Sequence, residues 1–178
     1  MNLINDMYKK IEGENLWSGS VSLDRNEVLK PSGMKDSNLY YIVSGSLKMS
    51  IFNKSKEHII RFGYKNNFIA ALDSFISGNP SDFCIQALKK TELKYISKEK
   101  HSTLINRNAE NQMLWRKILE QLVLEQLNRE KDILMTSPKE RFQKIFERSP
   151  HLFQEIPNKY IASYLRMTPE TLSRLKKS

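Results

Sequence analysis

Residues 39–52, LYYIVSGSLKMSIF, contain two strand-like runs separated by a serine-glycine turn. Glycine tolerates the positive φ of a tight turn, and Tyr, Ile, Val and Phe favour strands. Further short strand-like runs between turn residues extend from about residue 17 to residue 97. Many short strands at this spacing predict an antiparallel jelly roll or sandwich of about 80 residues. The clearest runs are 27–29, 39–43, 47–52, 58–64, 83–88 and 93–96.

Glycine marks a change of structural class along the chain. All six glycines lie between Gly13 and Gly78, and the last hundred residues contain none. Helices avoid glycine because fixing its flexible backbone costs more entropy than fixing other residues. Residues 2–12 also have the apolar spacing of a short amphipathic helix. We therefore predict an α+β protein with a β-rich first part and an all-helical second part.

A long helix is predicted over residues 109–135, after a brief helix that begins at Ser97. Its apolar residues are too many for one narrow stripe, which indicates that two faces are buried. A parallel helix of a second copy would cover the second face, with Ile118 and Leu122 near the seam. Packing within the same chain is the alternative explanation.

Residues 158–177, NKYIASYLRMTPETLSRLKK, carry the pattern of a helix-turn-helix. Apolar residues recur one turn apart in each half, and the small Ala162 lies where two helices would cross. Thr168 is expected to cap the second helix, and Pro169 fits its first turn. Arg166 occupies the turn position that needs a positive φ, at a cost of about 1 kcal/mol. A helical hairpin with exposed charges is the alternative structure.

These patterns divide the chain into three regions. Residues 1–108 form the jelly-roll domain with flanking helices, and residues 109–136 form the long helix, which links the domains and dimerises. Residues 137–178 form the helix-turn-helix domain, opened by the capping-box sequence Ser-Pro-Lys-Glu at 137–140. No wing is evident after the second helix, since the sequence stops at Ser178.

Charge is concentrated in the last region. The chain has 29 Lys and Arg against 20 Asp and Glu, a net charge of +9. Residues 137–178 carry nine basic and four acidic residues, the densest excess in the chain. A basic region favours a polyanionic partner, nucleic acid before membrane, and a solvated basic surface is the alternative.

Several classes of protein are excluded by the composition. No run of about 18 apolar residues could span a membrane, and the N-terminus lacks a signal-peptide core, so a cytoplasmic protein is expected. The single cysteine, Cys84, excludes an intrachain disulfide, a Cys-rich zinc site and an all-Cys iron–sulfur cluster. The three histidines have no ligand spacing, and no phosphate loop, nucleophile elbow or carboxylate cluster is present. We predict no metal, no cofactor and no enzymatic activity.

The order of jelly roll, long helix and helix-turn-helix resembles the cyclic-AMP receptor/Fnr (Crp/Fnr) family of bacterial transcription regulators. Residues 39–47 resemble that family's strand-turn-strand, with Gly45 at the turn. Residues 168–174, TPETLSR, resemble the start of its recognition helix, here at about 168–177. The resemblance covers roughly residues 20–177 and implies a homodimer that binds double-stranded DNA, with RNA polymerase as a further partner.

By this resemblance, the recognition helix supplies the base contacts. Glu170 and Arg174 would read bases, since Arg can donate two hydrogen bonds to guanine and Glu can accept one from cytosine. Ser173 shares their outward face and is the third candidate, whereas Pro169 stands where the family has an arginine, so one base contact is missing. The candidate phosphate contacts are Lys159, Arg166, Thr168, Thr171, Lys176 and Lys177.

The effector site of nucleotide-binding members is degenerate in this sequence. The family's Gly-Glu pair, which holds the ribose, aligns with Ala70 and Ala71. Its Arg-Ser pair, which holds the phosphate, aligns with Ser81 and Asp82. The site has thus lost its cation and gained a carboxylate, which repels phosphate. No useful affinity for cyclic AMP is expected, and the effector is unknown.

The sequence therefore predicts a dimeric, sequence-specific DNA-binding transcription regulator. Its two recognition helices would enter successive major grooves about 34–36 Å apart. One alternative is a ligand-sensing or scaffolding module whose helical tail binds protein. A second keeps DNA binding but places an unconventional ligand, such as a lipid or a metabolite, in the jelly roll.

Overall fold

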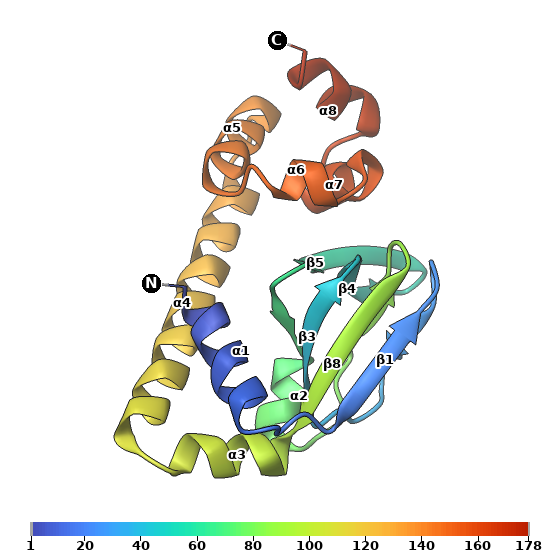
Figure 1. Ribbon diagram of the computed structural model, residues 1–178. Helices are drawn as coiled ribbons and strands as arrows, with labels where there is room; N and C mark the ends of the chain where they lie inside the picture. The colour runs from blue at the N-terminus through green and yellow to red at the C-terminus, as the bar shows by residue number, and fades with distance from the viewer. Residues whose placement is uncertain (1, 178) are drawn as a thin grey trace.

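A β roll, a long helix and a group of short helices follow one another along the chain (Figure 1). The computed structural model describes residues 2–177. The long helix α4 runs past one side of the roll, and the C-terminal helices lie at the far end of α4 (Figure 1). The predicted combination of an antiparallel roll with helices is confirmed.

The roll consists of two four-stranded antiparallel sheets, ordered β1-β8-β3-β6 and β2-β7-β4-β5. Their inner faces share one apolar core, to which Ile42 and Leu93 contribute from the first sheet and Leu47 and Ile85 from the second. The strands are β1 Gly19–Leu23, β2 Val28–Lys30, β3 Asn38–Ser44, β4 Ser46–Asn53, β5 Lys56–Tyr64, β6 Phe68–Ile69, β7 Cys84–Ala87 and β8 Thr91–Ser97.

Gly45 joins the two sheets. It has a φ of +94°, and a Cβ at this position would lie 2.3 Å from Thr91 Oγ1. Only glycine fits, because both the backbone conformation and the space exclude a side chain. β3 and β4 leave this turn into opposite sheets and do not pair with each other. The turn therefore sets the sandwich arrangement and is not a hairpin within one sheet.

Three helices pack with residues of the first sheet, Leu39, Phe68 and Ile96, that point away from the core between the two sheets. They are α1 Leu3–Gly13, α2 Leu72–Ser77 and α3 Lys98–Asn106. Met7 and Ile11 of α1 and Leu104 of α3 join Phe75 of α2 in an apolar cluster that also contains Leu114 of α4. The sequence patterns did not predict α2, which lacks a capping side chain at its start and has only six residues.

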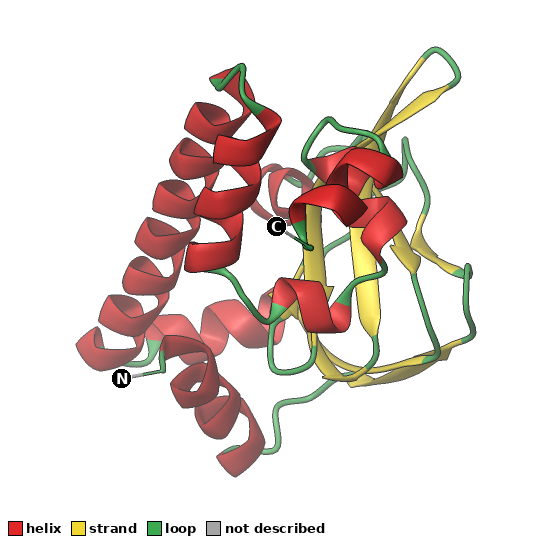
Figure 2. Ribbon diagram, turned by 90° about the horizontal axis from the view of Figure 1, so that it is seen from above, coloured by secondary structure: helices red, strands yellow, loops and turns green. Residues whose placement is uncertain are grey.

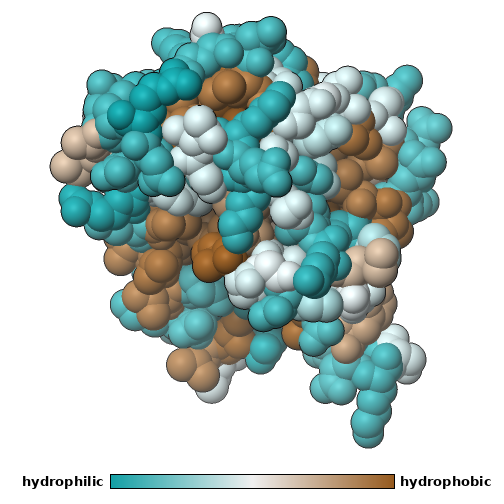
Figure 3. Space-filling view, turned by 90° about the horizontal axis from the view of Figure 1, so that it is seen from below, coloured by the Kyte–Doolittle hydropathy of each residue, from teal (hydrophilic) through white to brown (hydrophobic). Residues whose placement is uncertain are grey.

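The surface of the molecule seen from below the view of Figure 1 carries several separate hydrophobic patches between hydrophilic residues (Figure 3).

Helix α4, Ala109–Leu134, matches the predicted long helix within one residue. Its two sides differ in burial. Ile118 packs against the cluster that α4 shares with α1 to α3, and Leu122 is half-buried. The large apolar residues of α4 that are exposed are Met113, Val123, Leu124, Leu127 and Leu134.

Within the described residues, no helix is both long and apolar enough to cross a bilayer.

The predicted seam residues are half-buried within the chain. Ile118 packs against the apolar cluster of its own chain, and its place at a seam stays a prediction. The residues open to a partner lie about a third of a turn or more away around the helix, at Val123 and Leu127. Packing within the same chain therefore accounts for one face of α4, and the parallel partner helix stays a prediction for the exposed face.

The C-terminal region contains four helices: α5 Pro138–Arg148, α6 Leu152–Glu155, α7 Asn158–Tyr164 and α8 Pro169–Leu175. α5 turns back beside α4 (Figure 2). The side chain of Ser137 caps α5 by accepting from the Glu140 N–H at 3.4 Å, and Pro138 occupies the first turn, as predicted. α6 is an additional short helix that the sequence patterns did not predict.

Candidate nucleic-acid interface

Helix α8 has one buried side and one open side. Leu172 is fully buried in the apolar core of the C-terminal helices. The opposite side is polar and lies at the end of the molecule farthest from α3 (Figure 1). There the helix borders a shallow open depression of about 550 Å³, lined by Pro169, Glu170, Ser173, Arg174 and Lys177.

The first turn of α8 is held by its own side chains. Thr168 Oγ1 accepts from the Thr171 N–H at 3.2 Å, and the two threonine hydroxyls are 3.1 Å apart. The pKa of the Glu170 carboxyl is lowered by hydrogen bonds from its own backbone N–H and from the Thr168 hydroxyl. Glu170 is therefore ionised at neutral pH and is an acceptor at the start of the helix. The predicted cap and the predicted Pro169 at the first position are confirmed.

The turn between α7 and α8 has the predicted backbone. Arg166 has a φ of +54°, the left-handed conformation expected at this position. Buried Arg141 of α5 donates from Nε to the Leu165 carbonyl at 2.9 Å and from Nη2 to the Arg166 carbonyl at 3.4 Å. These bonds satisfy carbonyls that the end of α7 leaves unpaired. Arg141 also donates to the carbonyls of Met135 and Thr136, which ties the turn to the end of α4.

The predicted phosphate contacts are distributed around α8 and α7. Lys177 lies at the depression with the predicted base readers. Lys176 points elsewhere, because its Nζ donates to Asn158 Oδ1 at 3.0 Å, at the start of α7. Lys159 Nζ lies 4.6 Å from the centre of the Tyr160 ring. The structure therefore brings Glu170, Ser173, Arg174 and Lys177 together at the depression. It places Lys159 on α7 and the ammonium group of Lys176 at the start of α7.

The C-terminal helices pack directly on the roll. Ile59 and Phe62 of β5 belong to the same apolar cluster as Ile161 of α7 and Leu172 of α8. At the rim of this contact, Lys89 Nζ forms an ion pair with Glu155 at 2.9 Å. The open side of α8 takes no part in this packing, so the roll supports the helix without covering its polar face.

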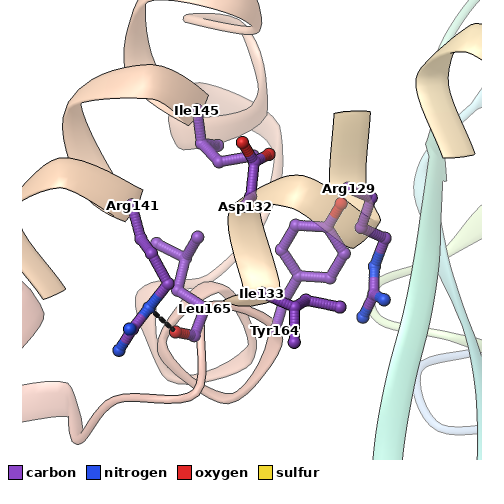
Figure 4. A pocket seen from close by; sticks show the side chains of 7 residues that line it. All are labelled: Arg129, Asp132, Ile133, Arg141, Ile145, Tyr164 and Leu165. Carbon is purple, nitrogen blue, oxygen red and sulfur yellow. Dashed lines mark hydrogen bonds between the residues drawn. The ribbon is translucent and has the colours of Figure 1, made fainter. Parts of the chain in front are cut away.

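A small cavity marks the junction of α4, α5 and α7 (Figure 4). Its volume of about 10 Å³ approaches the minimum for a single water molecule, so it is a packing defect and not a ligand site. Asp132 is buried beside it and pairs with Arg148 of α5. The cavity is lined by Arg129, Asp132, Ile133, Arg141, Ile145, Tyr164 and Leu165.

In the roll, the residues predicted to form the degenerate effector site are largely closed off. Ala71 and Ser81 are buried, Ala70 is half-buried and Asp82 is exposed. The nearest cation is buried Lys30 of β2, whose Nζ donates to the carbonyls of Ser81 and Phe83.

Comparison with protein families identifies the roll. Residues 20–108, half of the chain, match the model described as the cyclic nucleotide-binding domain. The chain belongs to this family. A comparison with curated proteins finds no match.

Solved structures with similar folds include longer proteins of this domain arrangement. FixK2 from Bradyrhizobium japonicum is 14% identical, with a TM-score of 0.74 over 89% of this chain and 82% of its own. A double mutant of CooA from Carboxydothermus hydrogenoformans is 14% identical, with a TM-score of 0.72 over 99% and 83%. The c-di-GMP-responsive global regulator CLP of Xanthomonas campestris is 16% identical, with a TM-score of 0.67 over 96% and 90%. At these identities the similarity shows a shared fold.

Membership of the cyclic nucleotide-binding domain family makes the position of Lys30 informative. The sequence predicts a phosphate site without a cation, whereas the structure places this ammonium group against the same segment. Two of its three N–H groups already bond to backbone carbonyls, so Lys30 acts as an internal tether of that segment. In the sequence, the buried position of Lys30 was indicated only by its place at the end of the short apolar strand Val28–Lys30.

The sequence patterns did not single out Arg129 of α4 and Arg141 of α5, which connect the parts of the molecule. Both helices are rich in Lys, Arg and Glu, and neither position differs in sequence from an ordinary solvated residue. Arg129 is half-buried and Arg141 is buried only because α4 and α5 pack against the rest of the chain.

Proposed function

We propose that the chain is a dimeric, sequence-specific DNA-binding transcription regulator of the Crp/Fnr type, with α7 and α8 as its helix-turn-helix. The observation that carries the proposal is the open polar side of α8, where Glu170, Ser173 and Arg174 line one depression. A helix anchored by an apolar side, with acceptor and donor side chains on the other, suits the major groove. Glu170 and Arg174 are the base readers in this proposal.

The domain arrangement supports this proposal. FixK2, CooA and CLP share the fold over most of both chains, and CLP is described as a regulator that links signalling to virulence gene expression. The basic excess of residues 137–178 fits a polyanionic partner. Thr168, Thr171 and Lys177 are the proposed phosphate contacts nearest to the base readers.

Helix α4 supports the dimer. Its exposed apolar residues share one side of the helix and are densest at Val123, Leu124 and Leu127, between the charged pair Arg116–Glu120 and Lys131. Leaving several large apolar side chains on one helix face in water is unfavourable, and a second α4 would cover them. In that dimer the two copies of α8 would address two half-sites of a palindrome about 34–36 Å apart.

The proposal is tested with DNA selected by the protein itself. Repeated filter binding from a random-sequence duplex pool should enrich a near-palindromic motif. The enriched duplex should bind at least about 1000-fold more tightly than the starting pool at physiological salt. The logarithm of its binding constant should fall linearly with the logarithm of salt concentration, since counterions are released. A protein whose helical tail binds protein would enrich no motif and would retain no duplex specifically.

Cyclic nucleotides are not expected to bind to the roll. Ala71 offers no carboxylate for the ribose, Asp82 adds a negative charge, and the Lys30 ammonium is engaged with backbone carbonyls. Isothermal titration calorimetry with cyclic AMP and with cyclic GMP should therefore show no heat of binding at micromolar to submillimolar concentrations. Micromolar binding of either nucleotide would contradict this prediction and would point to a rearranged phosphate segment.

A further inference from the structure

Arg129 lies where three parts of the molecule meet. It belongs to α4, and its Nη2 donates to the carbonyl of Ile59 in β5 of the roll at 2.7 Å. Its guanidinium carbon also lies 4.6 Å from the centre of the Tyr164 ring at the end of α7. Figure 4 shows the arginine beside this ring at the junction of the helices. One side chain of the long helix therefore contacts both the roll and the proposed DNA-binding domain.

The Tyr164 ring continues the contact into the roll. Its centre lies 5.4 Å from that of Phe62 in β5, and both belong to the apolar cluster between roll and C-terminal helices. Tyr164 is thus held between an aromatic ring of the roll and a cation of α4. A cation near the face of a desolvated aromatic ring gains more than it would at an exposed site.

The Arg129 contact depends on the shape of the guanidinium. The Nε–H is buried and has no hydrogen-bond acceptor among the described residues. A planar guanidinium can lie over a ring and donate sideways to a carbonyl at the same time, whereas an ammonium group offers no such plane. The geometry therefore requires arginine and not only a positive charge.

We propose that Arg129 is a positioning residue, which fixes the DNA-binding helices relative to the roll and to α4. This inference rests on the proposed function. The contact leaves the open side of α8 uncovered, so it orients the domain without blocking it. In a dimer built on α4, this orientation sets the spacing of the two recognition helices and lets both bind one palindrome simultaneously.

The chain offers a matched control for this residue. Arg61 of β5 forms an ion pair with Glu125 of α4, one turn before Arg129. This pair also joins α4 to the roll, but it is more exposed to solvent and involves no residue of α7. Arg61→Gln therefore removes a guanidinium between the same two elements and leaves the contact with Tyr164 in place.

The experiment compares a full palindrome with its half-site. The probes are the duplex enriched by the wild-type protein from a random pool and a duplex with only one half of that motif. Fluorescence anisotropy measures the affinities of the wild type, Arg129→Gln, Arg129→Lys and Arg61→Gln for both. Arg129→Gln should bind the palindrome at least about tenfold more weakly, because two loosely oriented domains bind with a lower effective concentration. Its affinity for the half-site should stay within about twofold.

The other variants sharpen this expectation. Arg129→Lys retains the charge and should recover the palindrome affinity only in part, while Arg61→Gln should match the wild type on both duplexes. An equal loss of Arg129→Gln on palindrome and half-site, or no loss on either, would overturn the positioning role.

Hydrogen exchange tests the junction separately from DNA binding. Backbone amides of α7 and of β5 should exchange faster with solvent in Arg129→Gln than in Arg61→Gln, because the contact between the C-terminal helices and the roll opens more often. Unchanged exchange in Arg129→Gln would overturn the inference. Failure of the wild-type protein to enrich any duplex, with faster exchange in Arg129→Gln, would instead overturn the proposed function and leave Arg129 established as the tether.

Discussion

Replacing both Leu124 and Leu127 by aspartate is expected to convert the proposed dimer into a monomer. Both leucines are exposed in the isolated chain, at 61% and 46%, so the fold does not need them. Burying each leucine stabilises the proposed dimer by about 1.5–3 kcal/mol. Because both protomers carry the substitutions, the dimer loses the two leucines of each. We expect the dimer dissociation constant, measured by sedimentation equilibrium, to rise at least about 1000-fold.

Gln121→Asp provides the control on the same helix. Gln121 is exposed and lies at the edge of the apolar side, about 60° from Leu124 and about 120° from Leu127 around the helix, and its side chain donates to Glu125 at 3.1 Å. This variant should remain a dimer and should have the same circular dichroism spectrum as the wild type. A Leu124→Asp, Leu127→Asp protein that stays dimeric would show that α4 is not the seam.

Arg174→Ala is expected to remove base discrimination at one position of each half-site. The lost pair of hydrogen bonds is worth about 1–3 kcal/mol, so the wild-type motif should bind about 5- to 150-fold more weakly per half-site. Affinity for an unrelated duplex should change by less than about tenfold, since most nonspecific binding comes from phosphate contacts. Anisotropy with the selected duplex, singly substituted duplexes and an unrelated duplex measures the difference.

Lys177→Ala is the matched comparison, because Lys177 lies at the same depression and is a proposed phosphate contact. It should weaken binding to all duplexes to a similar extent and reduce the slope of the salt dependence by about 2, about 1 for each half-site. If Arg174→Ala instead lowers affinity equally on every duplex, Arg174 contacts phosphate and does not read a base.

The region around α8 shows how far local sequence reaches. The Thr168 cap, Pro169 in the first turn and the left-handed Arg166 were predicted from residue type and spacing alone, and each is confirmed. All three depend on contacts within a few residues of the chain, which a short pattern contains. The base-reading roles of Glu170 and Arg174 remain predictions, although the structure places both side chains on the open side of the helix.

Helix α4 shows where periodicity stops being sufficient. Its length was predicted almost to the residue, and one of its two predicted buried faces packs within the chain, while burial of the other remains a prediction. The pattern did not tell which face packs within the chain, and Ile118, predicted near the seam, packs against the cluster that contains Phe75 and Leu114. An apolar residue has the same periodicity whether its partner lies in the same chain or in another.

By itself, the sequence determined the antiparallel roll, the long helix and the caps of the short helices. The loss of the acidic and basic groups of a nucleotide site remains a prediction from the resemblance. Only the tertiary structure showed Lys30 tethering the segment at Ser81, and Arg129 joining α4 to Ile59 and Tyr164. The physical reason is how far apart along the chain the interacting residues lie. Caps, turns and amphipathic faces arise from neighbours along the chain, whereas Arg129 and Ile59 are 70 residues apart and meet only after the domains have packed.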